Sequence, residues 1–396
     1  MRNAKILVLL NSVYYAWFWL GVWVLYYSRF GGFAAVGILE TVMIVSTIIF
    51  EIPTGAIGDL LGKKKTLIVA YILSGISNIW MGFAPNLLHM CLSLVLMNFG
   101  GALRSGTFEA LLYESLKAEG KETRYTKILS SMTASRLITL SIAGIIGGYL
   151  YQFSPQLPFI LTGVVITLGG LLSIFLQDVA EEQESFSLTT YLKQNVKGTK
   201  ELFKTKEIAV RTGALLLIMV VVLIMYEGLN DILSVGFGFT EVQLGIFAAV
   251  LGLVGAGSSM LAGRFSEKGY GRMLYLWAII MYGVSLVISP FVGFLLGGAT
   301  ILLRNIAGPI IENETSAFLN EKVESRYRAT ALSAFSMLKS LPYAMSIYLI
   351  SAATDFFPPA WVAFSIGCFF AFGVLINWIV FRPKVHDASE MDGVKV

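Results

Sequence analysis

Long apolar segments alternate with short polar segments along almost the whole chain. Each apolar segment holds about 20 residues, the length that a helix needs to cross a lipid bilayer. We therefore predict an all-α integral membrane protein with twelve transmembrane helices. The predicted spans cover residues 5–28, 33–57, 66–84, 87–114, 129–151, 155–177, 210–233, 240–262, 273–289, 291–315, 328–352 and 358–381.

The longest polar stretch divides these spans into two groups of six. It covers residues 178–209 and predicts a cytoplasmic linker between an N-terminal six-helix bundle, residues 1–177, and a C-terminal six-helix bundle, residues 210–384. We expect residues 385–396 to form a cytoplasmic tail. Within the linker, the sequence LTTYLKQNVKGTKELF is typical of a short amphipathic helix on the membrane surface, so we predict a linker with some surface helix.

Lysine and arginine residues concentrate in alternate connections between the spans, and the connections on the other side hold only Arg29. Positively charged connections usually lie in the cytoplasm, so this distribution predicts that both termini are cytoplasmic. An even number of spans is required for that arrangement. We therefore expect a multi-pass protein of the cell (inner) membrane, with the lipid bilayer as a partner.

Composition agrees with a membrane protein and excludes several other classes. Hydrophobic residues make up 56% of the chain and charged residues 14%, against about a quarter charged in soluble proteins. The net charge of +4 reflects the cytoplasmic connections, so we expect no nucleic-acid partner. Two histidines and two cysteines do not form a metal-binding pattern. We expect no metal, no cofactor and no enzymatic activity.

A pair of oppositely charged residues recurs in the two halves. Glu109 and Arg136 lie 27 residues apart on either side of a polar turn, and Glu312 and Lys339 repeat both the charges and the spacing 203 residues later. The two members of each pair are roughly 12–14 Å from the same membrane face, because a helix rises by about 1.5 Å per residue. Each helical hairpin therefore brings an acid and a base to one level, where they can pair.

Charged residues inside membrane spans are costly and usually functional, although they also pair simply to hold helices together. A buried carboxylate keeps its charge beside a cation and takes up a proton when the cation moves away. Glu109 is our first candidate for a proton carrier, with Arg136 and Arg104 as its partners. The second candidate is Glu312 with Lys339, and the third is Glu51. The alternative is that both pairs only lock adjacent helices.

The turn after the second span resembles the cytoplasmic signature of the major facilitator superfamily, G-x-x-x-D-x-x-G-K-K. Its positions are held by Gly55, Asp59, Gly62, Lys63 and Lys64. Leu60 departs from the pattern, since that position is often arginine. A weaker copy, AGRFSEKGYGR, lies between spans eight and nine. The resemblance implies two pseudo-symmetric six-helix bundles around a central cavity that opens alternately to each side of the membrane, in a protein that functions as a monomer.

The resemblance also implies roles for particular residues. Spans one, four, seven and ten would face the cavity, which makes Arg104, Arg304 and Asn305 candidates for binding a substrate. The signature turn would latch the two bundles in the outward-facing state, with Asp59 close to basic residues such as Arg124. Three aromatic residues deep in the first span are further candidates for lining the cavity, or else pack against helices and lipid: Tyr14, Tyr15 and Trp19.

Three functions fit these observations. The first is proton-coupled export of small amphipathic or drug-like compounds. It draws on span five, where Ala143-Gly144-Ile145-Ile146-Gly147-Gly148 half-matches the G-x-x-x-G-P-x-x-G-G pattern of drug–proton antiporters, although close packing by small residues explains it equally. The second is proton-coupled or facilitated import of an organic anion or nutrient, which the intramembrane arginines would serve. The third is a lipid-handling or non-transporting protein of the same fold.

Overall fold

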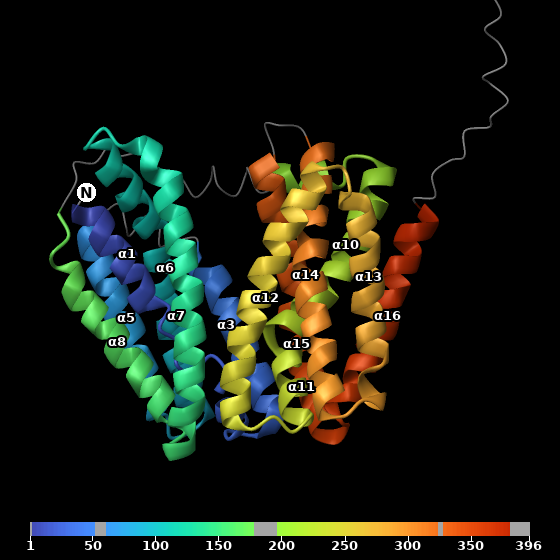
Figure 1. Cartoon of the computed structure of the whole chain (residues 1–396), viewed down its shortest axis with the longest axis horizontal. Coiled ribbons are helices and arrows are strands. Elements are labelled where there is room, and N and C mark those ends of the chain that lie inside the picture. The colour runs from blue at the N-terminus through green and yellow to red at the C-terminus, as the bar shows by residue number, and fades with distance from the viewer. Residues whose placement is uncertain (1, 52–60, 178–195, 324–327, 381–396) are drawn as a thin grey trace, which may run out of the picture.

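The computed structural model describes residues 2–51, 61–177, 196–323 and 328–380. The first half of the chain forms one bundle of helices, seen in blue to green in Figure 1. Its helices are α1 (Arg2–Tyr14), α2 (Trp23–Ser28), α3 (Gly32–Glu51), α5 (Lys63–Gly82), α6 (Leu87–Lys117), α7 (Tyr125–Phe153) and α8 (Leu157–Ser173), with a short 3-10 helix, η1 (Glu122–Arg124), before α7.

The second half forms the other bundle, seen in green-yellow to red in Figure 1. Its elements are α10 (Lys206–Ile224), a π-helical turn η2 (Met225–Leu229), α11 (Asn230–Gly236), α12 (Glu241–Glu267), α13 (Gly271–Val287), a 3-10 helix η3 (Ser289–Phe291), α14 (Phe294–Lys322), α15 (Arg328–Phe356) and α16 (Pro359–Val380). Residues 196–202 are also helical, whereas the rest of the predicted linker up to residue 195 lies outside the described residues.

The described helices run between the two faces of the molecule twelve times, when α1 with α2 and α10 with α11 are each counted as one span. This confirms the predicted fold of twelve spans in two bundles. Seven helices of the described chain are individually long and apolar enough to cross a membrane, and α8 and α13 are shorter apolar helices. The upper face of Figure 1 carries the start of α1 and the end of α16. The lower face carries the turns at residues 28–32, 153–157 and 236–241.

The first span departs from the prediction, because it is not one continuous helix. Helix α1 ends at Tyr14, and helical structure resumes at Trp23 in α2. Broken membrane helices need new partners for the backbone groups that the break leaves free, and a contact with α8 supplies one of them. The backbone N–H of Phe18 donates to Thr162 Oγ1 at 3.0 Å, and the carbonyl of Phe18 packs against Gly147, where a side chain would not fit.

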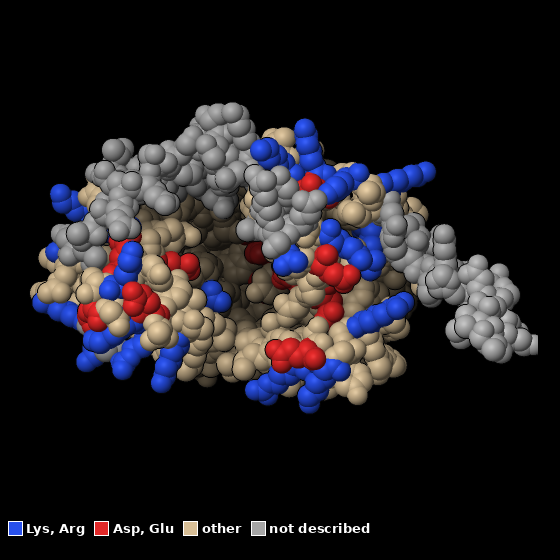
Figure 2. All heavy atoms as spheres, turned by 90° about the horizontal axis from the view of Figure 1, so that it is seen from above, with Lys and Arg blue, Asp and Glu red and all other residues tan. Residues whose placement is uncertain are grey.

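The two bundles touch at the lower face and separate at the upper face. Helix α3 packs against α15 and helix α7 against α12, and at both contacts glycines let the backbones approach closely. A Cβ atom added to Gly148 would lie 2.7 Å from the carbonyl oxygen of Glu241, and one added to Gly37 would lie 2.7 Å from Tyr348 Cα. Figure 2, seen from above, shows the hollow between the bundles that opens on the upper face.

Candidate functional site

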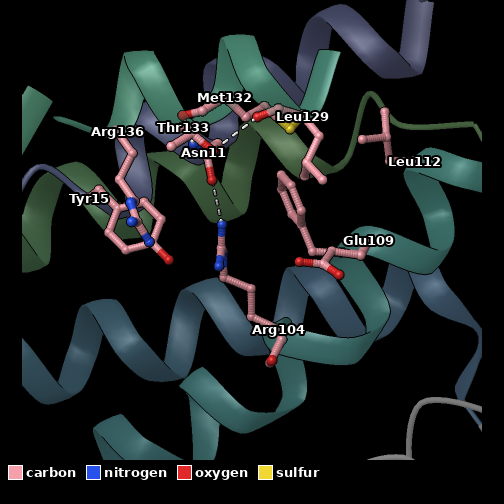
Figure 3. A pocket seen from close by; sticks show the side chains of 11 residues that line it. Asn11, Tyr15, Arg104, Glu109, Leu112, Leu129, Met132, Thr133 and Arg136 are labelled. Atoms are coloured by element: carbon pink, nitrogen blue, oxygen red, sulfur yellow. Dashed lines mark hydrogen bonds between the residues drawn. The ribbon is translucent and has the colours of Figure 1, made fainter. Parts of the chain in front are cut away.

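A cavity of about 160 Å³ lies in the N-terminal bundle (Figure 3). It is built between α1, α6 and α7, so that residues far apart in the sequence line a common space. Its lining is polar, with two arginines and one glutamate, and consists of Asn11, Tyr15, Arg104, Ser105, Phe108, Glu109, Leu112, Leu129, Met132, Thr133 and Arg136.

Arg104 is held in this cavity by neutral groups. Its side chain is buried, its Nη2 donates to Asn11 Oδ1 at 3.0 Å, and its Nε donates to the hydroxyl of Tyr71 at 3.3 Å. Its guanidinium carbon lies 4.1 Å from the centre of the Tyr14 ring and 4.4 Å from that of Phe108. Among the described residues no carboxylate pairs with Arg104, so its charge is oriented without being neutralised.

Arg136 is the second cation of the cavity. Its guanidinium carbon lies 5.2 Å from the centre of the Tyr15 ring, and its buried Nε has no hydrogen-bond partner. Figure 3 shows Arg136 beside Tyr15 and away from the carboxylate of Glu109. The predicted ion pair between Glu109 and Arg136 is therefore absent from the described structure, because the aromatic face of Tyr15 takes the guanidinium instead. Sequence spacing placed both residues at one level but did not reveal this competitor.

The corresponding pair in the second half does form. Lys339 Nζ donates to Glu312 Oε1 at 2.8 Å, as the repeat predicts. The Glu312 side chain is 53% exposed, whereas that of Lys339 is 14% exposed. An ion pair with one open member contributes little to stability, about 0–1 kcal/mol. The carboxylate of Glu312 is therefore accessible to water and protons while it remains beside its cation.

Arg304 does not line the central hollow, and the prediction that it does is wrong. It is 1% exposed inside the C-terminal bundle, where its Nε donates to Asn230 Oδ1 at 2.9 Å and its Nη1 donates to the carbonyl oxygen of Ser285 at 3.0 Å. A buried arginine bound by an asparagine thus recurs in both bundles, as Arg104 with Asn11 and as Arg304 with Asn230. Arg104 lines the cavity between α1, α6 and α7, whereas Arg304 is buried within its bundle. The neighbouring Asn305 lies beside Gly255 of α12.

The three aromatic candidates divide between the cavity and its support. Tyr15 lines the cavity, and Tyr14 lies against Arg104. Trp19 stacks on Trp17, with ring centres 5.1 Å apart, and its indole N–H donates to Asn78 Oδ1 at 2.9 Å. Trp19 therefore holds the broken first span against α5 and is absent from the lining of this cavity.

Three carboxylates lie where the bundles meet toward the lower face. In the sequence, their positions inside predicted spans are the only sign of a functional role. Glu40 of α3 is 3% exposed and accepts a hydrogen bond from the hydroxyl of Tyr343 of α15 at 2.8 Å. Asp231 of α11 accepts one from the indole of Trp23 of α2, also at 2.8 Å. Glu227 lies in the π-helical turn, four residues before Asp231.

The signature turn is only partly described. Gly55 and Asp59 lie outside the described residues, as does the side chain of Glu51 at the end of α3. Gly62 has a φ of 80°, which favours glycine, and precedes α5. Lys63 Nζ pairs with Glu114 at 2.7 Å and so ties this turn to α6. Lys64 is in the first turn of α5, and Arg124 ends the 3-10 helix η1 on the same face.

Comparisons with known proteins identify the family. The family model of the Major Facilitator Superfamily matches residues 6–347. The uncharacterized MFS-type transporter YxaM of Bacillus subtilis (strain 168) is 22% identical over 387 residues, which are 92% of each chain. An uncharacterized MFS-type transporter of Methanocaldococcus jannaschii is 30% identical over 132 residues, 32% of this chain and 31% of that protein.

Solved structures agree at the level of the fold. A mutant of the nucleoside transporter NupG superposes with a TM-score of 0.78 at 15% identity, over 96% of this chain and 99% of that chain. A bacterial homolog of the human lysosomal transporter Spinster, inward-facing and unoccupied, superposes with a TM-score of 0.75 at 14% identity, over 96% of both chains. The chain therefore belongs to the Major Facilitator Superfamily, and it is a multi-pass secondary transporter.

Proposed function

We propose that this transporter carries a small organic anion together with protons, and that the cavity between α1, α6 and α7 binds the anionic group. The observation that carries the proposal is the charge of this cavity. Arg104 and Arg136 both line it, and neither pairs with a carboxylate among the described residues. A partly buried cation without a counter-ion is costly, so an anionic ligand gains the attraction of two guanidinium groups that are already oriented.

Glu109 supplies a physical link between the anion and the proton. Its carboxylate lines the cavity that holds the two arginines, and its negative charge opposes the arrival of an anion. Protonation of Glu109 removes that repulsion, and by reciprocity a bound anion favours protonation of Glu109. Anion and proton therefore bind together, which is the requirement for cotransport. Where the outer side of the membrane is more acidic, cotransport results in uptake.

This charge distribution favours the organic-anion hypothesis over export of lipophilic cations. Two cations would repel a cationic drug, and Glu109 is the one carboxylate among the described residues that line the cavity. The half-matching glycine pattern of span five has a packing explanation, because Gly144 and Gly148 lie against the backbone of α12. Proton-coupled export of amphipathic compounds therefore becomes the second hypothesis.

The distribution of lysine and arginine supports one orientation of the transporter in the membrane. The upper-face connections carry most of these residues, and Arg29 is alone at the lower face. We infer that the upper face is cytoplasmic, in the cell membrane, and that the described conformation is open to the cytoplasm. An anion in the cavity would then be ready for release into the cell or for binding from it.

Glu109→Gln is expected to separate anion movement from proton movement. Glutamine resembles the protonated carboxyl, so anion binding and exchange of labelled anion across the membrane persist. The proton flux that accompanies anion uptake disappears. The measurement uses purified protein in liposomes with an internal pH-sensitive dye, screened with small mono- and dicarboxylates, amino acids and lipophilic cations.

Glu312→Gln is the matched control, because Glu312 occupies the repeated position but pairs with Lys339 and lies outside the cavity. It is expected to retain proton flux. Anion-driven proton flux that survives in Glu109→Gln contradicts the role of Glu109. Proton flux driven only by lipophilic cations would instead support export. If no compound crosses the membrane, a lipid-handling or non-transporting function becomes the better hypothesis.

A further inference from the structure

The first turn of α3 donates backbone hydrogen bonds to a side chain of the opposite bundle. The backbone N–H groups of Phe33 and Ala34 donate to the two carboxylate oxygens of Asp355, at 2.7 and 2.8 Å. Asp355 lies in the last turn of α15, which is part of the C-terminal bundle, and α3 belongs to the N-terminal bundle. One side chain therefore bridges the two bundles at the lower face.

The sequence around α3 offers no local alternative to this cap. The first N–H groups of a helix have no partner within the helix and are usually satisfied by a nearby serine, threonine, aspartate or asparagine. The residues just before α3 are Arg29, Phe30 and Gly31, which lack such side chains, and the hydroxyl of Ser28 donates to Leu25 instead. Asp355 therefore supplies the helix N-cap that the local sequence lacks.

Two further features agree with this contact. Gly32 has a φ of 72°, and a Cβ atom added to it would lie 2.7 Å from Asp355 Oδ1, so glycine makes room for the carboxylate. Asp355 itself is near the C-terminus of α15, where the helix dipole disfavours a negative charge. At the N-terminus of α3 the helix dipole favours the same charge. The carboxylate of Asp355 therefore interacts favourably with the dipole of α3 and unfavourably with that of α15.

We propose that Asp355 and the N-terminus of α3 form a latch that holds the lower face closed. The latch breaks whenever α3 and α15 separate at that face, and water then replaces the carboxylate. Two other contacts share this interface: the hydrogen bond from Tyr343 to Glu40, and that from Thr41 Oγ1 to the carbonyl oxygen of Ala344 at 3.2 Å. The latch sets how often the transporter opens to the lower side, whatever substrate it carries.

The test measures lower-face opening through a buried position in the α3–α15 contact. Ser351 of α15 has no exposed surface, and its hydroxyl has no hydrogen-bond partner. Ser351→Cys is placed in a background where Cys91 and Cys368 are replaced by serine. The rate at which a membrane-impermeant maleimide labels this cysteine in proteoliposomes then follows the fraction of time that the lower face is open.

Asp355→Ala is expected to increase this labelling rate by about five- to thirtyfold, the factor that corresponds to the loss of a helix N-cap. Asp355→Asn is expected to have a smaller effect, because asparagine also serves as an N-cap. The control cysteine replaces Ser173 of α8, which is also fully buried but lies within the N-terminal bundle. Its labelling rate should not change.

Two results would overturn the proposal. In the first, the labelling rate at position 351 is the same with aspartate and alanine at position 355. In the second, labelling at position 173 rises by the same factor as at position 351, which means that Asp355 stabilises the protein in general. Both measurements are made without substrate, so their outcome is independent of the proposed organic-anion transport.

Discussion

Replacing Arg104 by glutamine is expected to weaken binding of the transported anion by about 10- to 150-fold, because hydrogen bonds to a charged group contribute roughly 1.5–3 kcal/mol. The loss has two sources. The anion loses one of the two guanidinium groups of the cavity, and Asn11 and Tyr71 lose the group that they hold. The affinity of Arg104→Lys for the anion should fall between those of the wild type and Arg104→Gln, because lysine keeps the charge but not the planar guanidinium.

The measurement is the concentration dependence of anion uptake, or of anion binding to purified protein. Because Arg104 is buried and could be needed for folding, Arg136→Gln is the second variant. Its Nε has no hydrogen-bond partner, and its replacement should weaken binding without loss of folded protein. Lys339→Gln is the matched control, since Lys339 pairs with Glu312 in the other bundle. Equal losses in all three variants would contradict an anion site centred on the two arginines.

Gly148→Ala is expected to hold the bundles apart at the lower face. The added methyl group would lie 2.7 Å from the carbonyl oxygen of Glu241 and 3.0 Å from Val242 Cα, both backbone atoms of α12. Overpacking of this kind costs about 1–3 kcal/mol, which corresponds to a roughly 5- to 150-fold shift toward the conformation in which these helices separate. Gly37→Ala should act in the same direction at the contact between α3 and α15.

Maleimide labelling at position 351 checks this prediction, and Gly252→Ala provides the control on α12. A methyl group added to Gly252 meets no other atom within 4 Å, so labelling should stay at the wild-type rate. The combination of Gly148→Ala with Asp355→Ala should exceed either single change, because the two sites are in different inter-bundle contacts. A labelling rate unaffected by Gly148→Ala would mean that α7 and α12 remain together when the lower face opens.

Much of the fold was available from the sequence alone. The length of the apolar runs determines that the chain crosses the membrane twelve times, because only helices of about 20 residues satisfy their backbone groups within lipid. The repeat of Glu109 and Arg136 as Glu312 and Lys339 marked two related halves. It also placed each acid and base at one level, since helical rise is constant. The glycines of span five fit both the antiporter pattern and close helix packing, so the sequence alone did not separate these two explanations.

The tertiary structure decided which of these groups meet. The Glu312–Lys339 pair forms, but Tyr15 takes the guanidinium of Arg136, and Arg304 turns into its own bundle toward Asn230. These outcomes depend on side chains from helices distant in the sequence, and spacing along one helix carries no information about them. For the same reason the sequence did not reveal the break in the first span, which packs against α5 and α8 of its own bundle, or the cap that Asp355 provides to α3 from the opposite bundle.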